Sequence, residues 1–105
     1  DDSVGEIDSV LGRLGLRDNT VFIFASDNGG LTLGPTSNYP LLGGKSFPYE
    51  GGVRTPLFIR WPSGIKAGSQ SNTRVTHMDL YPTLLEMAGL PLRPDQHVDG
   101  LSLIA

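Results

Sequence analysis

The sequence predicts an α/β fold in which two helical segments flank two short strands. Apolar residues recur at helical spacing near both ends of the chain, in residues 4–14 and 80–88. Two short apolar runs of strand length lie between them, in residues 21–25 and 56–62. The order helix, strand, long loop, strand, helix is that of an α/β arrangement, and we expect the two strands to be parallel.

Size and charge set limits on the classes of protein to which the chain can belong. Its 105 residues suit one small domain or a part of a larger one. The net charge is −3 and the basic residues are scattered, so we expect neither a nucleic-acid-binding surface nor a membrane-binding one. No apolar run approaches the ~20 residues that span a bilayer, and the first residues lack the features of a signal peptide. The absence of Cys excludes disulfides, thiolate metal sites and a Cys nucleophile within these residues.

The first helix is expected over residues 4–14. Its apolar positions recur every three or four residues, at Val4, Ile7, Leu11 and Leu14. Acidic residues near its start suit the positive end of the helix dipole. Gly15 is expected to end the helix as the C′ residue, with Leu16 folding back over it.

The central feature of the chain is the apolar run of residues 21–25, which stops abruptly at the polar sequence 26–30. Because the run does not alternate with polar residues, we expect a strand that is buried on both faces. Ligands of open α/β sheets bind beyond the carboxyl ends of the strands, where Asp27 and Asn28 would lie. Their carboxylate and amide oxygens are hard donors, so we predict a metal site at this strand tip. The alternative is an ordinary Asn-Gly turn.

Residues 29–55 are expected to form one long packed loop. They contain no convincing helix or strand, but they carry too many apolar residues for a free linker. Lys45 follows Gly43 and Gly44, which favours a backbone shaped to aim its side chain; the alternative is a solvated surface charge. A Lys ammonium is a compact charge that suits phosphate or sulfate oxygens.

The second half of the chain is expected to form a strand and a helix. Prolines border the strand at residues 56–62. Asp79 is a good N-cap for the helix that follows, Pro82 falls in its first turn, and Gly89 ends it. We expect its buried face to consist of Leu80, Leu84, Leu85, Met87 and Ala88.

Asp27 and Asn28 together with Lys45 suit an anionic substrate held against a divalent cation. Calcium and magnesium both accept carboxylate and amide oxygens, so these residues do not choose between Ca²⁺ and Mg²⁺. Two ligands are too few for Ca²⁺, which takes 6–8 oxygens. We therefore expect further ligands from residues outside this chain.

Several motifs follow one another along nearly the whole chain. The most informative are Ser26-Asp27-Asn28-Gly29, Gly43-Gly44-Lys45, residues 49–56, residues 79–85 and residues 99–103. In this order they resemble the sulfatase family of the alkaline-phosphatase-like superfamily. The resemblance implies that the chain is a fragment of a three-layer sandwich, with parallel strands flanked by helices and a long active-site loop.

The resemblance also implies roles for particular residues. Asp27 and Asn28 would ligate an active-site Ca²⁺, and Lys45 would be a catalytic and substrate-binding residue that contacts the sulfate group of the ester. In the family the metal polarises the sulfate and orients the nucleophile, while the Lys helps to neutralise charge. Glu50 and Arg54 match a family signature, and we expect them to form a buried ion pair that braces the loop.

The departures from the family pattern are informative as well. Family nucleophiles are formylglycines made in a Cys/Ser-x-Pro-x-Arg motif, which the 105 residues do not contain. The aspartate pair that completes the family's metal site and the histidines of its middle portion are also absent, and Leu42 and Ser46 stand where the family often has Arg and Gly. We therefore expect residues 1–105 to be the later portion of a sulfatase catalytic domain, without its nucleophile region and inactive alone.

The sequence leaves two alternatives beside a sulfate-ester hydrolase. One is a related metal-dependent phosphoryl hydrolase. The other is a non-catalytic module that folds alone or self-associates through an exposed sheet edge. The resemblance suggests a secreted, periplasmic or lysosomal parent protein, and it leaves the particular sulfate ester open.

Overall fold

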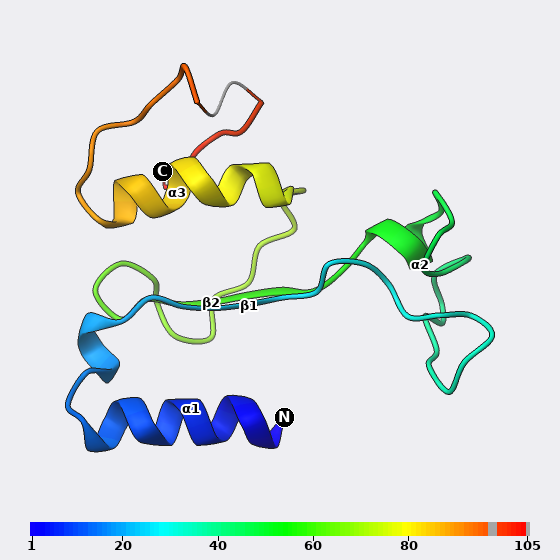
Figure 1. Ribbon diagram of the computed structural model, residues 1–105, viewed down its shortest axis with the longest axis horizontal. Coiled ribbons are helices and arrows are strands. Elements are labelled where there is room, and N and C mark those ends of the chain that lie inside the picture. Colours follow the sequence, from blue (N-terminus) through cyan, green and yellow to red (C-terminus); the bar gives the residue numbers. More distant parts are fainter. Residues whose placement is uncertain (97–98, 105) are drawn as a thin grey trace. The chain divides into compact units, whose positions relative to one another are not determined.

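The computed structural model describes residues 1–96 and 99–104. Its elements, in chain order, are α1 (Asp2–Arg13), η1 (Arg17–Asn19), β1 (Phe22–Ala25), α2 (Glu50–Val53), β2 (Leu57–Arg60), η2 (His77–Asp79) and α3 (Leu80–Met87) (Figure 1). The α/β class that the sequence predicts is confirmed. None of the described helices is long and apolar enough to cross a membrane. The chain divides into two compact units, Asp1–Ser69 and Gln70–Ala105, and each is described by itself.

Helix α1 forms where the apolar spacing predicts it, and it ends at the predicted glycine. Gly15 has a φ of +67°, a conformation that costs glycine nothing. The Leu16 N–H donates to the Leu11 carbonyl at 2.9 Å, and the Gly15 N–H donates to the Gly12 carbonyl at 3.1 Å. These two bonds satisfy carbonyls that the last helical turn leaves unpaired.

The prediction of a parallel strand pair is wrong. Strands β1 and β2 are antiparallel, with Phe22 opposite Arg60 and Ala25 opposite Leu57. A parallel pair needs a crossover that carries the chain back to its starting end. Here residues 26–56 instead reverse the chain beyond the end of β1, and β2 returns beside it (Figure 1).

The prediction that β1 is buried on both faces is also wrong. Phe22 and Ile23 are half-buried, whereas Phe24 and Ala25 are exposed. The reason is that a two-stranded sheet cannot cover its own faces. The rings of Phe24 and Phe58 pack across the strands with their centroids 6.2 Å apart.

Self-association of the chain through the edge of this sheet stays a prediction.

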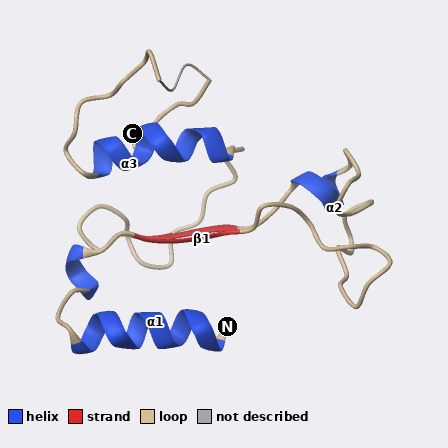
Figure 2. Ribbon diagram, in the orientation of Figure 1, coloured by secondary structure: helices blue, strands red, loops and turns tan. Residues whose placement is uncertain are grey.

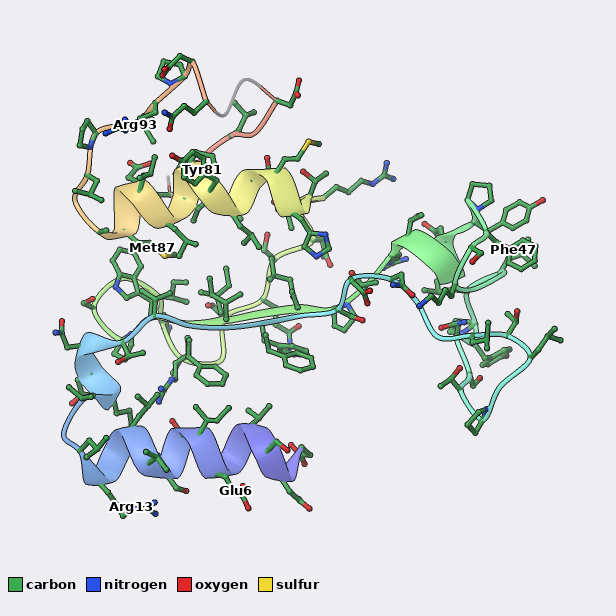
Figure 3. All side chains as sticks on the ribbon, viewed as in Figure 1. Glu6, Arg13, Phe47, Tyr81, Met87 and Arg93 are labelled. Carbon is green, nitrogen blue, oxygen red and sulfur yellow. The ribbon has the colours of Figure 1, made fainter. Side chains whose placement is uncertain are left out.

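Asp8 joins α1 to the strand pair within the first unit. Its carboxylate lies 2.6 Å from Nη1 of Arg60 on β2, and it also forms an ion pair with Arg17 of η1. Glu6 and Arg13 project from the side of α1 that faces away from β1 and β2 (Figure 3). The polar face of α1 is thus turned outward, while Asp8 fixes the other side to β2.

In the second unit, α3 forms as predicted and ends at Gly89, whose φ is +67°. Pro82 lies in its first turn, also as predicted. The predicted buried face is only partly correct, because Leu84 is 43% exposed and Ala88 is exposed. Leu80, Leu85 and Met87 are half-buried.

The fully buried positions of α3 are Pro82 and Thr83. The Thr83 hydroxyl donates to the Asp79 carbonyl and accepts a hydrogen bond of 3.0 Å from the Leu103 N–H. The returning C-terminal segment covers the helix at this polar side chain. A periodicity of apolar residues cannot reveal such a contact, which explains why the predicted buried face is only partly correct.

Asp79 is the N-cap residue of α3, as predicted, but its side chain makes no hydrogen bond to the first turn of that helix. Its carboxylate instead accepts a hydrogen bond of 2.7 Å from the Thr76 N–H, which closes a capping box around η2. The other carboxylate oxygen accepts one of 2.9 Å from the Leu101 N–H. The hydrogen bonds from the Leu101 and Thr76 backbone hold the pKa of Asp79 below its usual value.

The second unit should therefore lose stability in acid through Asp79. The lowered pKa means that this contribution is complete above the unfolded-state pKa of about 3.9 and disappears as the pH falls through the folded-state pKa. We expect the protection factor of the Leu101 amide, its intrinsic exchange rate divided by the observed rate, to fall as Asp79 becomes protonated, and Asp79→Asn to abolish the pH dependence of this protection factor. Asp95→Asn, at an exposed carboxylate of the same unit, is the matched control. An unchanged pH profile in Asp79→Asn would contradict this assignment.

Candidate functional site

The polar residues that follow β1 lie directly beyond its carboxyl end. The strand stops at Ala25, and the chain bends at once. The Ser26 hydroxyl donates to the Asn28 carbonyl at 2.9 Å and stabilises this bend. Asp27 is exposed and Asn28 is half-buried. Both residues thus occupy the strand tip at which the sequence places them.

The long loop folds back onto this tip. The Gly29 N–H donates to the Gly52 carbonyl at 2.9 Å, and the Lys45 N–H donates to the Gly30 carbonyl at 3.0 Å. The second bond places the backbone of Lys45 beside the residues that follow Asn28. Lys45 itself is exposed. The structure therefore brings the backbones of the three predicted site residues into one region.

Close contact between backbones, without intervening side chains, holds the loop together. A Cβ at Gly29 would lie 1.7 Å from the Gly51 carbonyl oxygen, and one at Gly44 would lie 2.3 Å from that of Gly30. A Cβ at Gly52 would lie 2.1 Å from the Phe47 carbonyl oxygen. Real Cβ atoms do not approach this closely, so these positions require glycine. The sequence reasoning identified Gly44 as framing Lys45, but it missed this mutual packing.

Asn38 is a further organising residue that the sequence reasoning missed. It is half-buried, and its side-chain amide bonds to the backbone of Gly30 and Gly43. Asn is common in loops, where it usually bonds to backbone only two residues away. Residue type and local spacing therefore carry no signal for contacts five and eight residues distant.

The loop contains one element that was not predicted, the single turn of α2. Most of the remaining chain between β1 and β2 is irregular, as predicted (Figure 2). Phe47 lies on the part of the loop beside α2 (Figure 3). Gly51 and Gly52 within the turn are buried, because they supply two of the close backbone contacts.

The Glu50–Arg54 ion pair exists, but the prediction that it is buried is wrong. The carboxylate and guanidinium groups are 3.7 Å apart, and their side chains are 64% and 67% exposed, respectively. The two residues are four apart along α2, where an exposed pair contributes about 0.3–0.5 kcal/mol. The backbone contacts of the loop, rather than this pair, provide the bracing.

The side chains at the tip are free to meet a ligand. Across residues 1–96 and 99–104, no hydrogen bond or ion pair engages the side chain of Asp27, Asn28 or Lys45. Within the same residues no group of three or more His, Cys, Asp or Glu could hold a metal ion. Asp27 and Asn28 thus have the donor chemistry for a hard cation, but they supply only two of the 6–8 oxygens that Ca²⁺ takes.

Comparison with known proteins assigns the chain to a family. The sequence model of the family described as "Sulfatase" matches residues 1–90. The chain belongs to the sulfatase family. This confirms the resemblance that the motifs indicated, and with it the alkaline-phosphatase-like fold of which the chain forms a small α/β part.

Similar proteins match the chain along nearly its whole length. N-acetylgalactosamine-6-sulfatase of Mus musculus is 44% identical over 108 aligned positions, covering 99% of the chain and 21% of that protein. Steryl-sulfatase of Homo sapiens is 37% identical, covering 97% of the chain and 19% of that protein. The crystal structure of Ps i-CgsB in complex with k-i-k-neocarrahexaose superimposes with a TM-score of 0.89 at 38% identity, covering 96% of the chain and 22% of that structure. The chain thus spans about a fifth of the length of the sulfatases that it matches.

The backbone packing of the loop predicts opposite effects for two Gly→Ala substitutions. Gly44→Ala places a Cβ against the Gly30 carbonyl oxygen and should destabilise the first unit by about 1–3 kcal/mol, as overpacking does. Gly5→Ala is the matched control, because its Cβ meets nothing within 4 Å. It lies inside α1, so Ala there should stabilise the helix by up to about 1 kcal/mol. Urea denaturation of the two variants measures both effects, and a shift in the same direction would refute the packing argument.

Proposed function

We propose that the chain forms part of the catalytic domain of a sulfatase, an enzyme that hydrolyses sulfate esters. Membership of the sulfatase family supports the reaction class. The observation that carries the proposal for this chain is the hydrogen bond from the Lys45 N–H to the Gly30 carbonyl. It supports a site in which a cation ligand pair and an anion-binding Lys lie at the same end of β1.

In this proposal Asp27 and Asn28 bind a divalent cation, expected to be Ca²⁺, with Mg²⁺ as the alternative. When bound, such a cation supplies Lewis-acid polarisation of the sulfate group. Two ligands are too few for Ca²⁺, so further ligands from residues outside this chain would complete its coordination. The exposed position of Asp27 at the strand tip is consistent with a ligand that reaches outward.

Lys45 is proposed to hold the sulfate oxygens. Its ammonium is a compact charge with three donors and suits the tetrahedral anion. A positive charge fixed beside the transferring group stabilises the negative charge that develops in the transition state. Because no side-chain partner within the described residues engages Lys45, the ammonium is free to perform this role.

The proposed substrate is a sulfate ester, without a particular alcohol. Two relatives are named N-acetylgalactosamine-6-sulfatase and steryl-sulfatase. Both names specify a sulfatase, but each specifies a different sulfated compound. The residues of this chain that are assigned to the site recognise a cation and a sulfate group. The proposal therefore goes no further than the chemistry common to both names.

The 105-residue chain alone should not hydrolyse sulfate esters. It contains no Cys/Ser-x-Pro-x-Arg motif to supply the family's nucleophile, and it offers only two ligands to the cation. We expect no sulfate release from an aryl sulfate, and calorimetric titration should give a Ca²⁺ dissociation constant of about 1 mM or weaker. Sulfate release by the purified chain would contradict the proposal that the nucleophile lies elsewhere.

The role of Lys45 is testable in a sulfatase polypeptide that contains this segment. Lys45→Gln should lower kcat/KM by about 10²–10³-fold, the usual effect of removing one group that stabilises transition-state charge. Lys66→Gln is the matched control, because Lys66 is an exposed lysine of the same unit outside the proposed site. A Lys45→Gln variant with unchanged kcat/KM would overturn the proposed function of Lys45.

A further inference from the structure

We propose that Asn38 is a positioning residue, which sets the place of Lys45 relative to the Asp27–Asn28 tip. The inference rests on the proposed function, because it concerns the same site. Its structural basis is the set of hydrogen bonds that the Asn38 side chain makes within the loop. Asn38 itself would touch neither substrate nor cation.

One side-chain amide connects the two segments that carry the proposed ligands. Oδ1 of Asn38 accepts from the Gly30 N–H at 2.9 Å, and Nδ2 donates to the Gly30 carbonyl at 2.8 Å. Nδ2 also donates to the Gly43 carbonyl at 3.1 Å. Gly30 lies two residues after Asn28, and Gly43 lies two residues before Lys45. The amide of Asn38 thus joins the segment that carries Asn28 to the segment that carries Lys45, at points two residues from each of them.

A direct backbone bond reinforces this connection. The Gly30 carbonyl accepts from the Lys45 N–H as well as from Nδ2 of Asn38, so both lone pairs of this oxygen are used. Asn38 holds the Gly30 peptide groups on both sides of the residue, which fixes the direction in which this carbonyl meets Lys45. The position of the Lys45 backbone therefore depends on the orientation that Asn38 imposes.

The contact is selective for an amide of this length. A Cβ at Gly44 would lie 2.7 Å from Nδ2 of Asn38, so the surroundings leave little space for a longer side chain. Asp would keep the acceptor for the Gly30 N–H, but a carboxylate cannot donate to the two carbonyls. Ala would remove all three bonds. Each substitution thus removes a defined part of the connection.

Positioning matters for Lys45 because its charge stands on a flexible four-carbon stem. The backbone must place the start of that stem correctly if the ammonium is to meet a sulfate bound at the strand tip. A misplacement of about 1 Å can cost roughly 10²-fold in rate. Fixing the spacing between the two segments is therefore a contribution to catalysis that is distinct from substrate contact.

The first test measures amide hydrogen exchange in the full 105-residue chain and does not depend on the proposed function. We expect Asn38→Ala to accelerate exchange at the Gly30 and Lys45 amides at least tenfold, and Asn38→Asp to give a smaller effect at Gly30 than at Lys45. The Leu16 and Leu90 amides, bonded at the ends of α1 and α3, should be unchanged and report that both variants remain folded. Ser37→Ala is the matched control, because Ser37 is the exposed neighbour of Asn38 and its hydroxyl accepts only from the nearby Tyr39 N–H within the described residues. It should leave exchange at Gly30 and Lys45 unchanged. Unchanged exchange at Gly30 and Lys45 would overturn the inference.

The second test is a double-mutant cycle in a sulfatase polypeptide that contains this segment. If Asn38 acts through Lys45, Asn38→Ala should lower kcat/KM at least tenfold, and it should cost much less when Lys45 is already Gln. A merely structural role would give independent, multiplicative losses, and that result would overturn the inference. A normal Asn38→Ala enzyme beside a defective Lys45→Gln enzyme would refute the inference alone. A normal Lys45→Gln enzyme would refute the proposed function and the positioning role with it.

Discussion

The close approach of backbone to backbone around Gly30, Gly44 and Gly51 is the constraint on which the candidate site depends. Three stretches of main chain meet there at distances that admit no Cβ, and hydrogen bonds between them satisfy the buried polar groups. Apart from Pro82, no large apolar side chain among the described residues is fully buried. The loop therefore keeps its shape through polar backbone contacts rather than through a hydrophobic core. The placement of Lys45 beside the end of β1 is a direct result.

The features that the sequence predicted correctly are those that local chemistry determines. The end of β1, and the position of Asp27 directly beyond it, follow from an abrupt change from apolar to polar residues. The ends of α1 and α3 follow from Gly15 and Gly89, because a left-handed residue after a helix is specific to a few residue types. Each of these signals is complete within a few neighbouring residues.

The features that the sequence did not predict depend on partners distant along the chain. The antiparallel direction of β2 results from the path of the intervening loop. Phe24 is exposed because no other segment covers its side of the two-stranded sheet within the described residues. Asp79 lies at the start of α3 as expected, but the sequence did not predict the hydrogen bond that its carboxylate accepts from the distant Leu101 N–H. Asn38 is the clearest case for the site, because nothing in its residue type specifies its contacts with Gly30 and Gly43. The family resemblance implied roles for Asp27, Asn28 and Lys45, but it did not point to Asn38.

A loop that is held by its own backbone can vary its outward side chains independently of its internal geometry. Leu33 and Tyr39 are 96% and 91% exposed, although they belong to the same loop as Asn38 and Gly44. Substitutions at such positions leave the glycine contacts and the Asn38 bonds untouched. The loop therefore separates the backbone contacts that set its shape from the side chains that face outward, so that a change of surface chemistry does not require a change of internal geometry.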